Sequence, residues 1–469
     1  MTTEHHTNTA GDSSQLPAST AFSPQRLILY CSIIFLLALG VRLLVWQHNR
    51  AAIEQVMTQL TITYKDDART LARGDFGLFV RGANPPSNAN VLAHPPGYSM
   101  LMAALFALTG ESDAGVRLFQ ILCDAISALL IFLIALELTT KRVAVIAGAL
   151  VALSPQLAYN SLLLLPDSLS VTPILLAVYL FIRARGRERG WPKLFIAGAL
   201  IGLSCWLRPN ALLLPLFLAA LVPLIFKRGQ RLRAAVALVF ACLLMIAPLT
   251  IRNAMVFHKF IPVSLGSGVT MIEGIADYDS QGRFGLPQTD MEVMRQEASI
   301  YKREDYAGTL YNPDGVERER GRTTRGLAVI AAHPFWFAGV MARRAASMLR
   351  MERVPVIAGS PLKLDSDEAS MTTKLLKLPG VLLKSIQKIF VTAIMLPLFL
   401  VGIILLTKAR DKHALALLLI VPLYYLSVQS LLHTEYRYVI AIQYFILIFV
   451  AVTIAWAGEA LRRRLKTNE

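Results

Sequence analysis

The residues best suited to chemistry lie in a polar stretch near the start of the chain, residues 64–98, between apolar segments. This stretch contains two adjacent carboxylates, Asp66 and Asp67, and it ends with the sequence His-Pro-Pro-Gly-Tyr at residues 94–98. A carboxylate can take a proton from a hydroxyl nucleophile. Charged side chains beside a membrane are costly unless they face water or perform a function. We therefore interpret the stretch as the acidic half of a site at a membrane surface.

Cationic residues that suit a phosphate group occur later in the chain. Arg208, Arg252 and Arg437 each lie at the predicted edge of an apolar segment, and Arg can hold a phosphate and neutralise the charge that develops on it. A third carboxylate, Asp167, lies in a Leu-Pro-Asp-Ser turn. Together these groups suit transfer from a lipid phosphate to a hydroxyl or an amine. Less specific roles stay open: a solvated Asp66–Asp67 pair, a helix cap at Asp167, carbonyl contacts of Arg208, and a Glu435–Arg437 ion pair.

The composition indicates a membrane protein. Of the 469 residues, 55% are hydrophobic and only 17% are charged, whereas a soluble chain carries about 25% charged residues. Several stretches run for nearly 20 residues without a charge, which is enough to cross a hydrocarbon core of about 30 Å. The net charge of +16 comes from short basic connections, as the positive-inside rule expects, and no nucleic-acid recognition motif accompanies it. The four cysteines lie far apart in apolar segments and are interpreted as core residues.

The apolar segments predict an all-α polytopic membrane protein with about ten transmembrane helices. The short basic connections between them fall on one side of the membrane only if the apolar segment 95–110 does not cross. As a helix, that segment would be about 24 Å long, which is short for a core of about 30 Å. We predict that it is a juxtamembrane helix. The predicted spans are 27–46, 116–138, 143–165, 169–182, 194–207, 211–226, 234–251, 389–406, 414–432 and 439–457.

This topology divides the chain into five parts. The candidate acids and cations then all lie on the side away from the cytosol. In the large outer loop, residues 326–351 are predicted to form an amphipathic helix at the membrane interface. Arg42, near the outer end of the first span, is expected to snorkel outwards. The parts are a disordered cytoplasmic N-terminus (1–26), a transmembrane module (27–251) with a first outer loop (47–115), the large outer loop (252–388), C-terminal transmembrane helices (389–458) and a basic cytoplasmic tail (459–469).

Several short motifs carry a family resemblance. Taken in order, they resemble the polytopic GT-C glycosyltransferases, specifically the family that includes protein O-mannosyltransferases and the aminoarabinose transferases of lipid A. Many members carry an acid shortly before the Tyr that opens the first motif. Here Leu60 and Thr61 occupy that place, so Asp66 and Asp67 are the nearest carboxylates. The motifs are residues 64–74, 94–98, 165–168 (Leu-Pro-Asp-Ser), 206–210 (Trp-Leu-Arg-Pro-Asn), 247–253 (Ala-Pro-Leu-Thr-Ile-Arg-Asn) and 433–438.

The resemblance implies transfer of one sugar, with inversion, from a polyprenyl-phosphate donor to a glycan, lipid or protein acceptor. The site would face the periplasm or exterior of a bacterial cytoplasmic membrane, with membrane lipids as further partners and no nucleic acid. Asp67 is the expected general base, Asp66 the alternative, and Asp167 would orient the acceptor. No cofactor and no metal motif are evident, although a divalent cation between these three acids stays open. The groups expected to hold the lipid phosphate are His94, Tyr98, Arg208, Arg252 and Arg437.

Two other classes of protein remain as alternatives. An envelope polysaccharide ligase or polymerase is also polytopic and would transfer a whole glycan from a lipid diphosphate. A transporter or lipid flippase predicts charged residues within the spans, for which Asp124 and Glu137 are the best candidates. The sequence contains neither a Gly-Lys-Ser/Thr phosphate loop nor a His-Glu-x-x-His motif, which disfavours an ATP-driven pump and a zincin-type protease.

Overall fold

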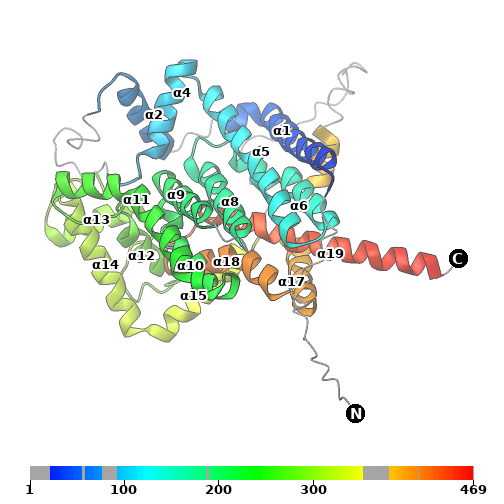
Figure 1. Ribbon diagram of the computed structural model, residues 1–469. Helices are drawn as coiled ribbons and strands as arrows, with labels where there is room; N and C mark the ends of the chain where they lie inside the picture. The colour runs from blue at the N-terminus through cyan, green and yellow to red at the C-terminus, as the bar shows by residue number, and fades with distance from the viewer. Residues whose placement is uncertain are drawn as a thin grey trace, which may run out of the picture.

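The computed structural model describes residues 22–54, 59–76, 92–185, 190–351, 380–409 and 411–467. Within these ranges the regular secondary structure is helical (Figure 1), so the predicted all-α fold class is confirmed. Apart from residues 22–26, the predicted disordered N-terminus lies outside the described ranges. The helices of the bundle are α1 (Pro24–Glu54), α5 (Asp113–Leu138), α6 (Lys141–Leu153), α8 (Pro166–Ala184), α9 (Trp191–Leu207), α10 (Leu214–Ile225), α11 (Arg231–Phe257), α17 (Thr392–Lys408), α18 (Lys412–Val428) and α19 (Ile440–Thr467).

Shorter helices lie at the ends of this bundle and in the segment between α11 and α17. α2 and α4 lie side by side at one end of the bundle (Figure 1). We call the helices α12 to α15 the loop module, because they fall within the predicted large outer loop. These shorter elements are α2 (Gln59–Ala72), α4 (Gly97–Thr109), α7 (Pro155–Asn160), η2 (Pro209–Ala211), α12 (Ser267–Ala276), α13 (Asp290–Tyr301), α14 (Gly315–Ala332), α15 (Pro334–Met348), η5 (Gln429–Leu431) and η6 (Tyr436–Val439).

The predicted number of membrane spans is not confirmed. In the described ranges, six helices are long and apolar enough to cross a membrane, or up to eight if each of two bent helix pairs forms one span. The predicted span 143–165 is interrupted, because Ser154 leaves the helical conformation and its side chain caps α7 instead. Pro155 follows, and a proline cannot continue the hydrogen-bond ladder of α6. A count of about ten spans is therefore not confirmed.

The two ends of the bundle differ in charge. Ion pairs at one end join Arg183 to Glu137 at 2.6 Å and Arg142 to Glu459 at 2.8 Å. α5 and α8 end there and α6 begins there, so the basic connections gather at this end. The opposite end contains the start of α8, the end of α9 and the start of α19, together with α2 and α4. We call it the α2 end.

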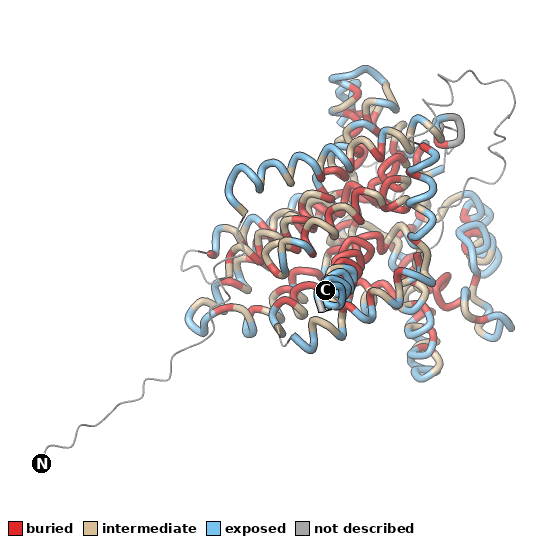
Figure 2. Tube along the Cα trace, turned by 90° about the vertical axis from the view of Figure 1, so that its right-hand side faces the viewer, coloured by how far each residue is buried: buried red, intermediate tan, exposed pale blue. Residues whose placement is uncertain are grey.

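A buried charge pair lies in the bundle core, contrary to the expectation that Arg42 snorkels outwards. Arg42 is 0% exposed, and its Nε donates to Asp124 Oδ2 at 2.6 Å. The guanidinium also donates to the carbonyls of Val151 and Ala152 at the end of α6. Figure 2 shows the buried residues running through the middle of the bundle. Because a charge in an apolar core must be paired, Asp124 is interpreted as a structural partner, which weakens the transporter alternative.

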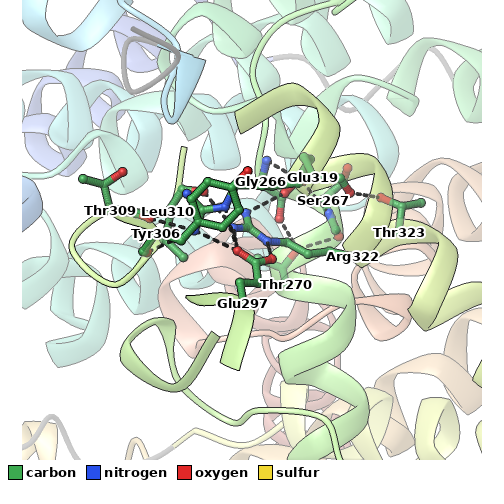
Figure 3. Close-up of polar contacts among 12 residues, drawn as sticks. Gly266, Ser267, Thr270, Glu297, Tyr306, Thr309, Leu310, Glu319, Arg322 and Thr323 are labelled. Carbon is green, nitrogen blue, oxygen red and sulfur yellow. Dashed lines mark hydrogen bonds and ion pairs between the residues drawn. The ribbon is translucent and has the colours of Figure 1, made fainter. Parts of the chain in front are cut away.

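A buried charge network holds the loop module together (Figure 3). Glu297 of α13 accepts hydrogen bonds from Arg322 of α14 at 2.6 and 2.7 Å and from Arg318 at 2.8 Å. Glu319 accepts from the backbone N–H groups of Gly266 and Gly268 at 2.8 and 2.6 Å, which ties α12 to α14. Removing one partner of a buried ion pair leaves an uncompensated charge.

Replacing Glu297 with Gln is expected to destabilise the loop module by about 3–5 kcal/mol. The reason is that Arg318 loses its carboxylate partner inside the protein and Arg322 keeps only Glu319, at 3.2 Å. Hydrogen exchange of the α14 amides measures the loss directly. As a control, Asp305→Asn removes an exposed pair with Arg303 and should leave this exchange unchanged. Equal protection in both variants would show that the network does not stabilise the module.

The predicted amphipathic helix at residues 326–351 is two helices. α14 and α15 meet at Pro334 with a bend of 107°. Arg344 of α15 is buried and donates to the carbonyls of Ser430, at 2.7 Å, and Gly274, so it fastens the module to the α2 end of the bundle. At the same contact the His433 N–H donates to the Thr270 carbonyl at 2.6 Å. The loop module thereby fixes the segment that leads into η6.

Candidate active site at the α2 end of the bundle

An ion pair between α8 and the end of α9 lies at the centre of the site. Pro209 disfavours a helical conformation at Arg208, which is extended and ends α9. The Arg208 Nη2 donates to Asp167 Oδ2 at 3.0 Å, and Nε lies 2.9 Å from Oδ1. These side chains are 10% and 3% exposed. Asp167 lies in the first turn of α8 but does not cap it, so its partner is Arg208.

The segment before α19 brings a second arginine to this pair. The Tyr438 ring lies under the Arg208 guanidinium, 4.7 Å from centroid to carbon. The neighbouring Arg437 forms a two-pronged pair with Glu435 at 2.6 and 2.9 Å, as one of the alternatives from the sequence anticipated. The Asn210 side chain donates to the Tyr438 carbonyl at 3.1 Å. This bond holds η6 against η2, so Arg208 and Arg437 both lie near His94.

Aromatic residues of α2 and α4 form the other wall of the site. The Tyr64 ring meets the Tyr98 ring edge-on at 5.0 Å and lies 5.7 Å from the His94 ring. Burial, together with the Arg208 and Arg437 cations, lowers the pKa of His94 to about 4. His94 is therefore neutral at pH 7, and it can offer a phosphate a hydrogen bond but not a positive charge.

Gly97 explains the Pro-Pro-Gly-Tyr sequence at the start of α4. A Cβ atom at Gly97 would lie 2.5 Å from the carbonyl oxygen of Trp206 in the last turn of α9. Only glycine permits this approach. The contact holds the start of α4 against the last turn of α9, so that His94 lies near Arg208, two residues after Trp206.

Replacing Gly97 with Ala is expected to destabilise the protein by about 1–3 kcal/mol and to lower transfer activity more than tenfold. The added methyl group must push α4 away from α9, since the atom that it meets is backbone. Gly40→Ala is a matched control, because a Cβ at Gly40 has no heavy atom within 4 Å. Thermal unfolding and transfer assays on both variants check this. A Gly97→Ala variant that matches the control would refute the close-contact argument.

The two adjacent carboxylates have different surroundings. Asp67 is half-buried on the seam between α2 and α4, and burial raises its pKa to about 6, with a further increase from Asp66 and an opposing effect of the Ser99 hydroxyl. Asp66 is exposed and pairs with Arg69 at 2.9 Å. Asp67 lies three residues after Tyr64, a rise of about 4.5 Å along the helix. Of the two acids, only Asp67 is partly buried at the α2 end.

Two candidates from the sequence have polar groups that bond elsewhere. Tyr98 is fully buried, and its hydroxyl donates to Gln120 Oε1 at 2.8 Å. Arg252 lies on α11, where its guanidinium contacts Asn253 and Phe257. It is not among the cations that lower the pKa of His94. Both residues have contacts that support the local structure.

Two residues of the cluster, Tyr64 and Tyr438, were missed as functional candidates. A signal for Tyr64 exists in the sequence, because the buried positions of α2 are Thr61, Tyr64, Ala68 and Leu71. This helical spacing places Tyr64 on the inward face. Tyr438 has no comparable signal, since it lies in a short 3₁₀ turn whose position depends on Asn210.

The acids do not converge on a shared cation site. In the described ranges, no group of three or more His, Cys, Asp or Glu residues is arranged to hold a metal ion. Asp167 is paired with Arg208 and Asp66 with Arg69. The arrangement of these carboxylates gives no support to a divalent ion between Asp66, Asp67 and Asp167.

Comparisons with known proteins agree with this fold. Residues 93–251 match the family described as dolichyl-phosphate-mannose-protein mannosyltransferase. No curated protein matches the sequence. The oligosaccharyltransferase of Archaeoglobus fulgidus in its apo form superposes with a TM-score of 0.51 and 16% sequence identity, over 95% of this chain and 52% of that chain.

Two further structures of the same archaeal enzyme are similar to the chain. The form tethered to an acceptor peptide with the NVT sequon gives a TM-score of 0.53 and 15% identity, over 94% of this chain and 51% of that one. The complex with an inhibitory peptide and a dolichol-phosphate gives 0.50 and 15%, over 95% and 52%. The chain thus spans about half the length of this relative.

The protein is a polytopic membrane protein with the GT-C glycosyltransferase fold, as the motif resemblance predicted. Within that fold, the segment that resembles the dolichyl-phosphate-mannose-protein mannosyltransferases is 93–251. It includes His94, Asp167 and Arg208, whereas Asp67 and Arg437 come from outside it.

Proposed function

We propose that the protein transfers a sugar from a polyprenyl-phosphate donor to a glycan, lipid or protein acceptor, and that the α2 end of the bundle is the active site. The observation that carries this proposal is the buried Asp167–Arg208 pair with Arg437 beside it. Among the described residues, the buried Tyr64 Oη has no hydrogen-bond partner, whereas Asp167 Oδ1 and Arg208 Nε lie 2.9 Å apart in their ion pair. A buried hydroxyl without a partner beside two arginines needs an explanation, and a polar ligand supplies it.

Two arginines suit the phosphate of the donor. The planar guanidinium matches the oxygens of a phosphate, and Arg208 and Arg437 would stabilise the charge that grows on the leaving group. Asp167 holds Arg208 in place, and neutral His94 adds a hydrogen-bond donor. The complex of the archaeal oligosaccharyltransferase with a dolichol-phosphate supports a lipid phosphate as the ligand of this fold. Tyr98 and Arg252, given their other contacts, are not assigned to it.

Asp67 is the proposed general base. It would take the proton of the acceptor O–H or N–H as the acceptor oxygen or nitrogen bonds to the anomeric carbon and the bond to the phosphate oxygen breaks. Asp67 lies about one helical turn after Tyr64 in α2. Displacement from opposite sides of the anomeric carbon gives inversion. Asp66 is the less favourable choice, because it is exposed and paired with Arg69.

The charge at the opposite end of the bundle supports an orientation. Lys and Arg residues concentrate on the cytoplasmic side of membrane proteins. Arg142 and Arg183 lie at the end away from the site, which supports a site on the outer face. In a bacterium this would be the periplasmic or exterior face of the cytoplasmic membrane.

The proposal is tested with purified protein in lipid nanodiscs. One radiolabelled sugar is supplied on polyprenyl monophosphate and, in parallel, on polyprenyl diphosphate, with extracted envelope glycans, lipids and proteins as acceptors. We expect labelled covalent product and free polyprenyl monophosphate from the first donor. Product from the diphosphate alone would favour the ligase or polymerase. Movement of the donor between leaflets without any covalent product would favour a transporter.

A further inference from the structure

We infer that the hydroxyl of Tyr64 donates a hydrogen bond to a phosphate oxygen of the lipid donor, which makes Tyr64 part of the phosphate-binding site. The inference rests on the proposed function and adds a residue that neither the sequence motifs nor the comparisons assign. It begins from a buried donor group that has nothing to bond. Tyr64 is 2% exposed, and its Oη has no hydrogen-bond partner within the described part of the chain.

Three other deeply buried tyrosines have a partner for the hydroxyl. Tyr98 donates to Gln120 at 2.8 Å, Tyr424 donates to the Asn210 carbonyl at 2.6 Å, and Tyr444 donates to Asp124. Each of these hydroxyls is as buried as that of Tyr64. A buried hydroxyl without a partner is disfavoured, so a structural role for Tyr64 would be better filled by Phe.

The surroundings of Tyr64 indicate what kind of partner is missing. The charged groups close enough to affect the pKa of Tyr64 include Arg208 and Arg437, together with Asp167. The nearby acceptors are occupied, since Asp167 bonds Arg208 and Glu435 bonds Arg437. Among the described residues named here, the place therefore has cations and a hydroxyl donor, and its carboxylates are already paired. A phosphate, with several anionic oxygens, complements all of these groups at once.

The protonation state and rigidity of Tyr64 fit a donor role. Burial raises the pKa of its phenol well above the ordinary value, so the hydroxyl keeps its proton at neutral pH. The ring is held by the edge-on contact with Tyr98. In the same helix, the Thr61 hydroxyl donates to the Leu164 carbonyl at 3.4 Å, which anchors α2 to the turn before Asp167. The ring that carries the hydroxyl is thus held in place by contacts within the protein.

The test measures phosphate recognition without any sugar. Polyprenyl monophosphate, polyprenol of the same length and inorganic phosphate are each titrated against labelled donor bound to the protein in nanodiscs. Replacing Tyr64 with Phe removes one hydrogen bond to a charged group, so the affinity for polyprenyl monophosphate should fall at least about tenfold. Its affinity for polyprenol should not change. Tyr179→Phe, at the far end of α8, makes the same chemical change away from the site and should bind all three ligands as the unaltered protein does.

The outcomes separate the inference from the proposed function. If the unaltered protein does not prefer polyprenyl monophosphate over polyprenol, the proposed function fails and the inference fails with it. If it shows that preference and Tyr64→Phe keeps it in full, Tyr64 does not contact the phosphate, while the proposed function stands. If inorganic phosphate competes as well as polyprenyl monophosphate, the site binds a free anion, and a lipid phosphate is not its ligand. An equal loss of affinity for polyprenol in Tyr64→Phe would indicate a packing effect and overturn the inference.

Discussion

Replacing Arg208 with Lys is expected to lower sugar transfer by about 10²–10³-fold. Lys keeps the positive charge, so Asp167 retains a cationic neighbour, but it lacks the planar fork that reaches Asp167 and a phosphate together. The contact with the Tyr438 ring is also lost. The rate of release of polyprenyl monophosphate under single-turnover conditions measures the effect on the chemical step.

Arg208→Gln and its double variant with Asp167→Asn separate catalysis from stability. Gln alone leaves Asp167 buried without a cation, which should cost about 3–5 kcal/mol of folding free energy. The double variant removes both charges and should recover most of this stability but none of the transfer. If Arg208→Lys, or the double variant, transfers sugar at the rate of the unaltered protein, Arg208 does not hold the leaving phosphate.

Replacing Asp67 with Asn is expected to lower transfer by about 10²–10⁴-fold, the usual contribution of a general base. In the unaltered protein, kcat/KM should rise with pH through an inflection near pH 6 and reach a plateau above it. The reason is the raised pKa of about 6, which leaves Asp67 protonated below this pH and able to act as a base above it. The pH profile of kcat/KM in both proteins checks the assignment. An Asp67→Asn variant with the same profile and rate would exclude Asp67 as the base.

The neighbouring acid provides a matched control. The Asp66 charge contributes to the raised pKa of Asp67, so Asp66→Asn should keep most of the activity and move the inflection to lower pH. Folding raises the Asp67 pKa, so the ionised carboxylate costs stability above its unfolded pKa, and Asp67→Asn should not lower the melting temperature at pH 8. A large loss of activity in Asp66→Asn instead would make Asp66 the base.

Much of the fold follows from local sequence. Long apolar stretches predicted α1, α5, α8 and α11, because an apolar helix of sufficient length has few alternatives in a bilayer. The number of spans did not follow from local sequence in the same way. The break at Ser154 and Pro155 lies inside an apolar run, and hydropathy does not register a helix that stops there and restarts.

The candidate site was predicted in part. The motifs around His94, Asp167 and Arg208 pointed to residues that the structure brings together. The same reasoning placed Arg252 with them, but α11 directs its guanidinium to Asn253 and Phe257 instead. Sequence position gives the end of a helix on which a residue lies, and it does not give the direction in which the side chain points.

The sequence alone determined that this protein is an all-α membrane protein with acids and cations at the edges of its spans, because helix formation and burial in lipid depend on local composition. Only the tertiary structure decided which of them meet. The partner of Arg208 depends on how α8, α9 and the segment before α19 pack together, and the difference between Asp66 and Asp67 depends on the seam of α2 with α4. Burial and charge–charge contacts between segments distant in sequence set these properties, and no local pattern encodes them.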